Sequence, residues 1–217
     1  MDVVVAGGHG KVAQRLLERL AAAGDRARGL IRNPDHAADL ERLGAEPVLA
    51  DLEAEQDISR HLVGADAVVF AAGAGPGSGP ERKRTVDLGG ALKLIEGARA
   101  QGVGRYVMVS AMGAADPAAG PPAMRPYLEA KAEADAALRA SGLEWTIVRP
   151  GRLTDDPATG RVAVAPGLHR HGEIPRDDTA AVLAATLHAP STIGLAFEVL
   201  AGDTPVEEAV AALQTGS

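Results

Sequence analysis

Short apolar runs alternate with helix-like segments along most of this chain, and this alternation restricts the fold more than any other feature. Helical patterns are expected at residues 10–23, 35–43, 55–62, 85–101, 124–141, 177–188 and 205–213. Strands are expected at residues 2–6, 26–31, 46–49, 66–71, 104–110, 144–149 and 195–200. Several of these runs are apolar throughout, as in parallel strands that are covered on both faces. The pattern predicts an α/β fold, a doubly wound and mostly parallel sheet with helices on both faces.

Length and composition narrow the class of protein further. A chain of 217 residues can bury one sizeable core, so we expect a single domain over residues 1–217, with a less regular C-terminal part after residue 150 on the substrate side. The net charge of −7, without a long basic run, argues against binding to nucleic acid. The absence of cysteine excludes disulfides and thiolate metal sites, and no apolar run approaches a membrane span. We expect a cytoplasmic protein, monomeric or homodimeric, without a nucleic-acid or membrane partner.

The stretch AGGHGKVAQ, residues 6–14, lies between the first strand and the first helix. It fits a dinucleotide fingerprint as Gly8-x-Gly10-x-x-Ala13 or as Gly7-x-x-Gly10-x-x-Ala13. Glycine permits the tight turn and lets the backbone approach a pyrophosphate, while helix N-terminal amides favour its charge. The alternative for the loop is an ordinary turn. The side chain of His9 could add a hydrogen bond to a phosphate or face solvent, and solvent is favoured. We expect the cofactor to contact Gly7, Gly8, His9, Gly10, Lys11 and Val12.

The end of the second strand distinguishes NADP from NAD. NAD sites usually place a carboxylate there, but this strand ends in GLIRNP, with Arg32 at the position. A guanidinium suits a 2′-phosphate, so NADP (NADPH) is favoured over NAD, the alternative being a solvated arginine. Asp51 and Leu52 follow the third strand and are candidates for holding the adenine edge. Asp51 could equally cap the next helix.

A candidate acid–base pair lies on the helix expected at residues 124–141. Tyr127 and Lys131 are four residues apart and therefore share one helix face. A nearby ammonium is expected to stabilise the phenolate and to lower the pKa of the tyrosine. Ser110, at the end of a strand, could donate a hydrogen bond to a substrate carbonyl. The alternative is a tyrosine kept for cofactor binding or helix packing. No metal site is expected, because His169-x-His171 lacks a supporting third ligand.

In their order and spacing, these segments resemble the short-chain dehydrogenase/reductase superfamily. Within it they resemble the atypical NAD(P)-binding branch of flavin/biliverdin reductase-like and nitrogen-metabolite-repressor-like (NmrA-like) proteins. His9 and Ala13 depart from the residues common in relatives. The resemblance is carried by the glycine loop at 7–13, LIRN at 30–33, AD and L at 50–52, VVFAAGAGPG at 68–77, RYVMVSAMGA at 105–114, YLEAKAEAD at 127–135, WTIVRPG at 145–151 and FEVLAGDTP at 197–205.

The resemblance implies a Rossmann fold and assigns roles to several positions. It places Ala71, Ala72 and Gly73 beside the cofactor ribose, and Pro150 and Gly151 beside the nicotinamide. It maps the catalytic serine, tyrosine and lysine of the family onto Ser110, Tyr127 and Lys131, with Lys131 also holding ribose hydroxyls.

The sequence therefore predicts an NADP-dependent oxidoreductase that transfers hydride to or from a small carbonyl, quinone or flavin-like substrate. The alternative is an NADP-binding sensor or scaffold with little or no turnover. Isomerase or dehydratase chemistry also fits the family.

Overall fold

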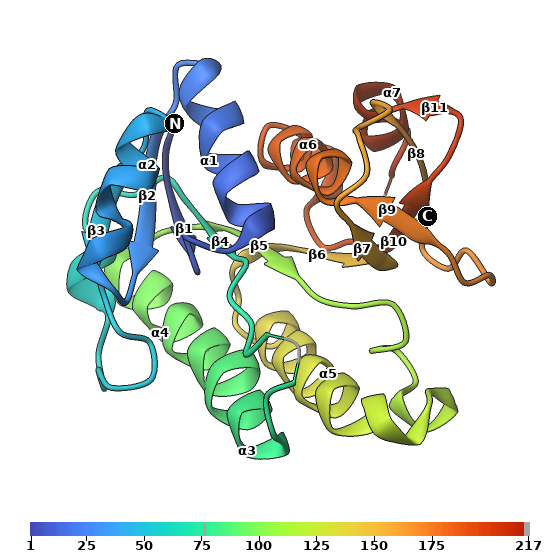
Figure 1. Cartoon of the computed structure of the whole chain (residues 1–217), viewed down its shortest axis with the longest axis horizontal. Helices are drawn as coiled ribbons and strands as arrows, with labels where there is room; N and C mark the ends of the chain where they lie inside the picture. The colour runs from blue at the N-terminus through green and yellow to red at the C-terminus, as the bar shows by residue number, and fades with distance from the viewer. Residues whose placement is uncertain (76, 215–217) are drawn as a thin grey trace.

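The computed structural model describes residues 1–75 and 77–214, and Figure 1 shows a central sheet between two layers of helices. Nine strands form this sheet in the order β11-β8-β10-β6-β5-β4-β1-β2-β3. The pairs from β3 to β10 are parallel, whereas β8 runs antiparallel to both β10 and β11. The strands are β1 (Asp2–Ala6), β2 (Arg26–Ile31), β3 (Glu46–Leu49), β4 (Ala67–Phe70), β5 (Arg105–Val109), β6 (Glu144–Pro150), β8 (Arg161–Ala165), β10 (Ala196–Ala201) and β11 (Thr204–Pro205), with β7 (Arg152–Thr154) and β9 (Glu173–Pro175) in a separate two-stranded sheet.

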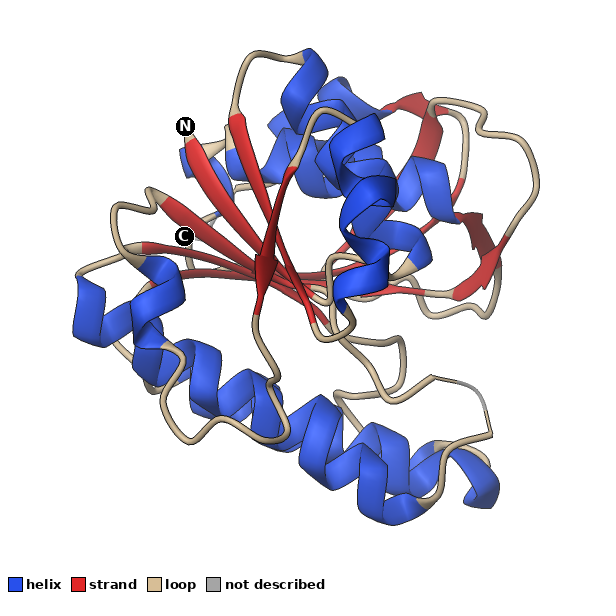
Figure 2. Cartoon of the chain, turned by 60° about the vertical axis from the view of Figure 1, so that its left-hand side comes forward, coloured by secondary structure: helices blue, strands red, loops and turns tan. Residues whose placement is uncertain are grey.

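The helices divide between the two faces of the sheet, which Figure 2 shows from a second direction. One face carries α1 (Lys11–Ala22), α2 (Ala37–Arg42), α6 (Arg176–Leu187) and α7 (Val206–Ala211). The other face carries α4 (Ala91–Gln101) and α5 (Arg125–Arg139). A short helix, α3 (Pro80–Arg82), and a π-helical segment, η3 (Lys83–Gly90), lead into α4. The described residues also contain the 3-10 turns η1 (Pro34–His36), η2 (Ser59–Leu62), η4 (Pro117–Ala119), η5 (Pro122–Met124) and η6 (Pro190–Thr192).

The sequence of β1 is almost entirely apolar because the strand is buried on both faces. Val3 and Val5 are fully buried on the face of α1 and α6, whereas Val4 and Ala6 are fully buried on the face of α4. Successive side chains of a strand point to opposite faces, so a strand covered on both sides needs apolar residues at every position. Strand β1 lies between β2 and β4, where the chain changes direction along the sheet. The carboxyl ends of the strands form a crevice at such a point.

The predicted doubly wound, mostly parallel fold is confirmed, and each of the seven expected strands is present within one residue at either end. The helix expected at 55–62 is wrong, because only η2 forms there. Asp51 and Asp57 accept hydrogen bonds from nearby amides and favour turns instead. The short strands β7, β8, β9 and β11 were missed. Pro76, part of the quoted motif at 68–77, lies outside the described residues.

Candidate functional site

In the glycine loop between β1 and α1, two glycines are packed so closely that a side chain would not fit at either position. Gly7 has a φ of +80°, and a Cβ atom there would lie 2.6 Å from the Cα of Ala72. A Cβ on Gly8 would lie 2.9 Å from the Cα of Gly29 in β2. The amide of Gly10 donates to the carbonyl of Gly7 over 2.8 Å, which closes the turn before α1 begins. The loop therefore presents bare backbone at a helix N-terminus, the arrangement that a pyrophosphate requires.

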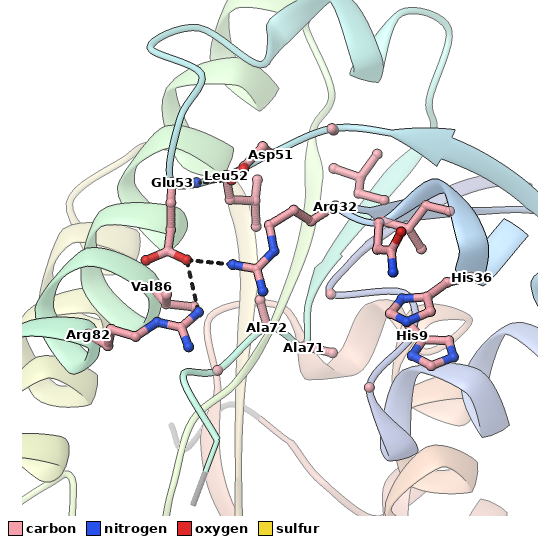
Figure 3. Close-up of a pocket in the computed structure, with 17 residues that line it drawn as sticks. His9, Arg32, His36, Asp51, Leu52, Glu53, Ala71, Ala72, Arg82 and Val86 are labelled. Atoms are coloured by element: carbon pink, nitrogen blue, oxygen red, sulfur yellow. Dashed lines mark hydrogen bonds and ion pairs between the residues drawn. The ribbon is translucent and has the colours of Figure 1, made fainter. Parts of the chain in front are cut away.

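A cleft of about 390 Å³ opens beside this loop, at the carboxyl ends of β1, β2, β3 and β4 (Figure 3). It is the crevice that the strand order predicts. Nine residues expected at the cofactor line it: Gly7, His9, Gly10, Arg32, Asp51, Leu52, Ala71, Ala72 and Gly73.

Three other residues of the glycine loop region do not line the cleft. Gly8 packs against β2, and its amide donates a hydrogen bond to the carbonyl of Leu30. Lys11 turns its ammonium to Asp155, 2.6 Å away, and Val12 packs into the core under α1. Only the backbone of Lys11 and Val12 is therefore placed to meet an anion at the helix N-terminus.

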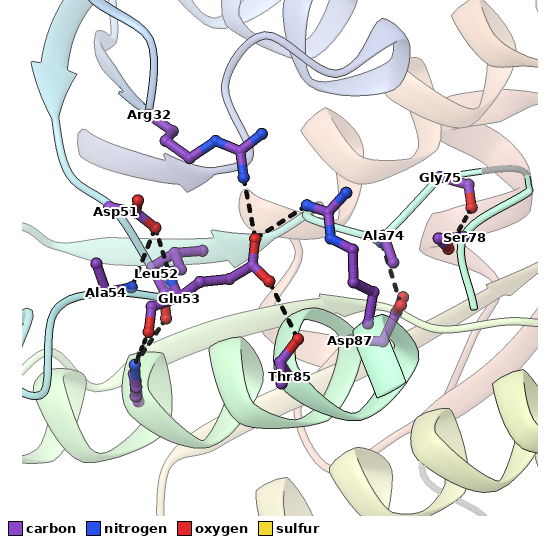
Figure 4. A network of polar contacts seen from close by, with 12 residues as sticks. Arg32, Asp51, Leu52, Glu53, Ala54, Ala74, Gly75, Ser78, Thr85 and Asp87 are labelled. Atoms are coloured by element: carbon purple, nitrogen blue, oxygen red, sulfur yellow. Dashed lines mark hydrogen bonds and ion pairs between the residues drawn. The ribbon is translucent and has the colours of Figure 1, made fainter. Parts of the chain in front are cut away.

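One wall of the cleft carries an ion cluster drawn from three separate elements (Figures 3 and 4). Glu53 follows β3, and its Oε2 lies 3.0 Å from Arg32 and 2.9 Å from Arg82. The hydroxyl of Thr85 donates to the other oxygen of Glu53 over 3.1 Å. The hydrogen bond from Arg82 contributes most to lowering the pKa of the Glu53 carboxyl. Sequence reasoning missed Arg82 and Glu53, although Arg82-Lys83-Arg84 is a conspicuous basic run in a long loop.

The opposite wall carries two stacked histidines. The rings of His9 and His36 are 3.5 Å apart between centroids and inclined by 10°. The Nε2 atom of His9 lies 2.8 Å from a carboxylate oxygen of Asp39, in α2. About a third of the His9 side chain stays exposed. The histidine thus lines the cleft and is also partly exposed to solvent, and its contact with a phosphate stays a prediction.

Beyond the cleft, a buried charge cluster lies at the carboxyl end of β5. The ammonium of Lys131 donates to the carbonyl of Val109 over 3.1 Å and lies 3.4 Å from Asp87. Asp87 also accepts a hydrogen bond from the amide of Ala74, the residue after Gly73 of the cleft. Lys131 and Asp87 are both almost fully buried. Ser110 is buried beside them, and its Oγ has no hydrogen-bond partner among the described residues.

Tyr127 adjoins this cluster but is not paired as expected. The Lys131 ammonium lies 5.9 Å from the centre of the Tyr127 ring, and that of Lys83 lies 5.2 Å from it. Burial, with the nearby carboxylates of Asp87 and Asp135, raises the pKa of Tyr127 well above its usual range. The expected lowering of this pKa is therefore wrong, chiefly because the phenol is buried and secondarily because Asp87 balances the charge of Lys131. Burial also lowers the pKa of Lys131, while Asp87 opposes that change.

Pro150 is the last residue of β6, and Gly151 follows it on the same edge of the sheet. The carbonyl of Pro150 accepts from the amide of Met112, and a Cβ on Gly151 would lie 2.5 Å from the Gly172 carbonyl. The amide of Ser110 donates to Val148 of β6. The predicted residues thus fall into two groups, the open cleft and the strand ends of β5 and β6. The contact between Asp87 and Ala74 connects the two groups.

Comparison with known families agrees with this geometry. A family model described as NAD(P)H-binding matches residues 7–190. The chain belongs to this family. The expected NAD(P)-binding Rossmann-fold assignment is confirmed, and a nicotinamide cofactor suits the bare glycine loop and the cleft beside it.

Relatives of this protein align with nearly the whole chain. The uncharacterized sugar epimerase YhfK of Bacillus subtilis (strain 168) is 42% identical, over 97% of this chain and 99% of the relative. A Bacillus halodurans structure described as an NAD-dependent epimerase/dehydratase superimposes with a TM-score of 0.93 at 43% identity, covering 97% of this chain and 98% of that one. The structure of the oxidoreductase ylbE of Lactococcus lactis superimposes with a TM-score of 0.89 at 25% identity. It covers 98% of this chain and 96% of that one.

Two further properties of residues 1–75 and 77–214 concern membrane-spanning helices and metal-binding groups of side chains. None of their helices is long and apolar enough to cross a membrane. Within the same residues, no group of three or more histidine, aspartate or glutamate side chains is arranged to hold a metal ion.

Proposed function

We propose that the protein is an NADP-dependent reductase of a small carbonyl, quinone or flavin-like substrate. The observation that carries this proposal is the cleft, which joins a bare glycine loop to a wall bearing two arginines. Gly7 and Gly10 would hold the pyrophosphate, and Arg32 would meet the 2′-phosphate of the adenosine ribose. Bound NADPH supplies the hydride in such a reaction.

The residues at the ends of β5 and β6 would serve the substrate. The hydroxyl of Ser110, which is buried and has no hydrogen-bond partner among the described residues, would donate to a substrate oxygen on which negative charge develops. The phenol of Tyr127 is protonated near neutral pH and would serve as the proton donor, although its raised pKa makes it a weaker acid than an ordinary tyrosine. Reduction, which consumes a proton at the substrate oxygen, suits this state better than oxidation.

The names of the relatives raise epimerase chemistry as another reading. Oxidation of a sugar hydroxyl during epimerisation requires a base to take its proton. A tyrosine whose pKa is raised by burial and two carboxylates does not supply that base near neutral pH.

A second candidate is an NADP-binding sensor or scaffold with little turnover. It is favoured by one observation: the polar partners of Lys131 are Asp87 and the Val109 carbonyl rather than the Tyr127 hydroxyl. In that case Lys131 would serve packing and cofactor orientation, and the cleft would report NADPH binding to a protein partner.

A substrate panel separates these readings. Loss of NADPH absorbance would be followed with quinones, flavins and small aldehydes or ketones, and NADPH affinity would be measured by calorimetry. For the reductase we expect turnover, and a kcat lower by about 10²- to 10⁴-fold in Tyr127→Phe at unchanged NADPH affinity. Turnover that survives this change would remove Tyr127 from the reaction. Tight NADPH binding without turnover on the panel would favour the sensor.

A further inference from the structure

The ion cluster on the cleft wall has an unusual composition for a site that faces a polyanionic cofactor. Its centre is a carboxylate: Glu53 places Oε2 between Arg32 and Arg82, at 3.0 and 2.9 Å. Arg32 follows β2, Glu53 follows β3, and Arg82 belongs to α3, so the three side chains converge from distant parts of the chain. All three line the cleft (Figure 3).

We propose that Arg32 and Arg82 together form the 2′-phosphate site, and that Glu53 is an internal occupant whose carboxylate the phosphate displaces. This inference rests on the proposed NADP dependence and extends it to two residues that determine cofactor choice. The cluster would then act as a selective site that is preorganised by its own acid.

The exposure of the cluster fits an exchangeable contact. The side chains of Arg32, Arg82 and Glu53 are 60%, 46% and 29% exposed. Ion pairs as exposed as these contribute little to folding stability. Holding both guanidiniums in one place nevertheless keeps them oriented toward the cleft before the cofactor arrives, which lowers the entropy cost of binding.

The charge of each anion determines which one binds the two arginines more strongly. Two guanidiniums and one carboxylate leave a net charge of about +1, whereas a phosphomonoester carries about −1.5 to −2 and three strong acceptor oxygens near pH 7. The phosphate can pair with both arginines in bidentate fashion, a geometry that the single shared Oε2 atom does not provide.

Glu53 would not be left without a partner after displacement. Its second oxygen, Oε1, accepts from the Thr85 hydroxyl over 3.1 Å, independently of both arginines (Figure 4). With NAD(H), which lacks the 2′-phosphate, the carboxylate would remain between the arginines. When NADP(H) binds, the 2′-phosphate therefore replaces the weaker carboxylate between the two arginines. NAD(H) has no such group and gains no binding energy from the arginines.

The test uses ligand fragments that contain or lack the 2′-phosphate. Calorimetry would measure binding of adenosine 2′,5′-bisphosphate and adenosine 5′-monophosphate, then of NADPH and NADH, to the whole protein. The variants are Glu53→Gln and Arg82→Gln. Glu46→Gln and Arg84→Gln are matched controls, because each removes the same charge from an exposed pair outside the cleft, with Arg26 and Glu133 respectively.

We expect Glu53→Gln to tighten binding of the bisphosphate and NADPH by about threefold or more, since it removes the competing anion while the amide oxygen of glutamine can still accept from the arginines and keep them oriented. Arg82→Gln should weaken both by about tenfold or more. Binding of the monophosphate and NADH should change by less than about twofold in both variants, and the controls should match the wild type. Unchanged or weaker NADPH binding in Glu53→Gln would overturn the inference, as would an equal loss of NADPH and NADH binding in Arg82→Gln.

The failure of the inference is distinguishable from the failure of the proposed function. If the wild type binds NADPH and NADH equally, and Arg32→Ala changes neither, the NADP dependence itself is wrong. If NADPH is preferred and Arg32→Ala removes the preference while Arg82→Gln preserves it, only the two-arginine site is wrong.

Discussion

Two groups of charges in this protein use the same chemistry in opposite surroundings. On the cleft wall, Arg32, Glu53 and Arg82 remain in contact with water. At the ends of β5 and β6, the pair of Lys131 and Asp87 is almost fully buried.

The difference teaches what each group is able to do. Exposed ions lose little by exchanging partners, because water stabilises them throughout. Buried ions have already lost their hydration, so removing one partner leaves the other without compensation. The cleft wall is thus suited to exchange with a ligand, whereas the buried group is suited to fixing the position of α5 and of the loop at Ala74.

The largest expected effect is on the buried side of this comparison. Lys131→Met should lower the free energy of unfolding by about 3–5 kcal/mol, because Asp87 would remain buried and charged. Urea unfolding would measure the change. The double variant Lys131→Met with Asp87→Leu is the control and should recover a large part of the loss. Equal stability of the single variant and the wild type would remove the distinction between the two groups.

The glycine loop at the base of the cleft is closely packed, unlike the ion cluster on the cleft wall. The variant Gly7→Ala tests this packing. We expect a loss of about 2–4 kcal/mol in unfolding free energy, because a Cβ would lie 2.6 Å from Ala72 and the φ is +80°. Gly24→Ala is the matched control, since Gly24 has a φ of +85° with nothing within 4 Å of the added carbon. A comparable loss in both variants would show that backbone strain alone, rather than close packing, constrains the loop.

A smaller effect concerns pH and the phenol beside the buried group. Burial first, then Asp87 and Asp135, raises the pKa of Tyr127. In the unfolded chain the phenol ionises near about pH 10, so the folded form holds its proton longer and stability should fall as the pH rises above that value. Tyr127→Phe should reduce this slope, leaving the part due to Tyr106, whose pKa burial also raises. Ionisation of Tyr127 at its ordinary pH, followed by tyrosinate absorbance, would contradict the assignment.

The smallest expected effect is on the exposed group. Glu53→Gln should change the free energy of unfolding at neutral pH by less than about 1 kcal/mol. The pKa of Glu53 is lowered, chiefly by its hydrogen bond with Arg82, so the pair stabilises above the ordinary glutamate pKa and loses its effect as the pH falls below it. Thermal unfolding across that acidic range would show the wild type losing slightly more stability than the variant. A large loss at neutral pH would place the cleft wall in the same class as Lys131 and Asp87.

The sequence predicted those features that depend on local pattern. Strand β1 was found because both of its faces are covered, and α1 because its glycine loop has a recognisable spacing. The helix expected at 55–62 fails because aspartate side chains capture backbone amides in turns, which an apolar periodicity does not reveal.

The site was predicted less completely, for a different reason. Arg32, Glu53 and Arg82 follow or precede different strands, and only the order of the sheet brings them together. Likewise, the spacing of Tyr127 and Lys131 suggested a pair, but the charge of Lys131 meets Asp87, which belongs to η3. Side-chain partners of this kind depend on tertiary geometry that periodicity cannot supply.

The contact of Gly7 with Ala72 has a consequence for how this family can diverge. Since the missing side chain makes room for another part of the protein itself, the glycine is required even in a descendant that has lost its cofactor. Its retention in a related chain is therefore not by itself a record of activity. Arg82 and Glu53 are partly exposed on the cleft wall and are not under this packing constraint, so they are more informative about cofactor binding.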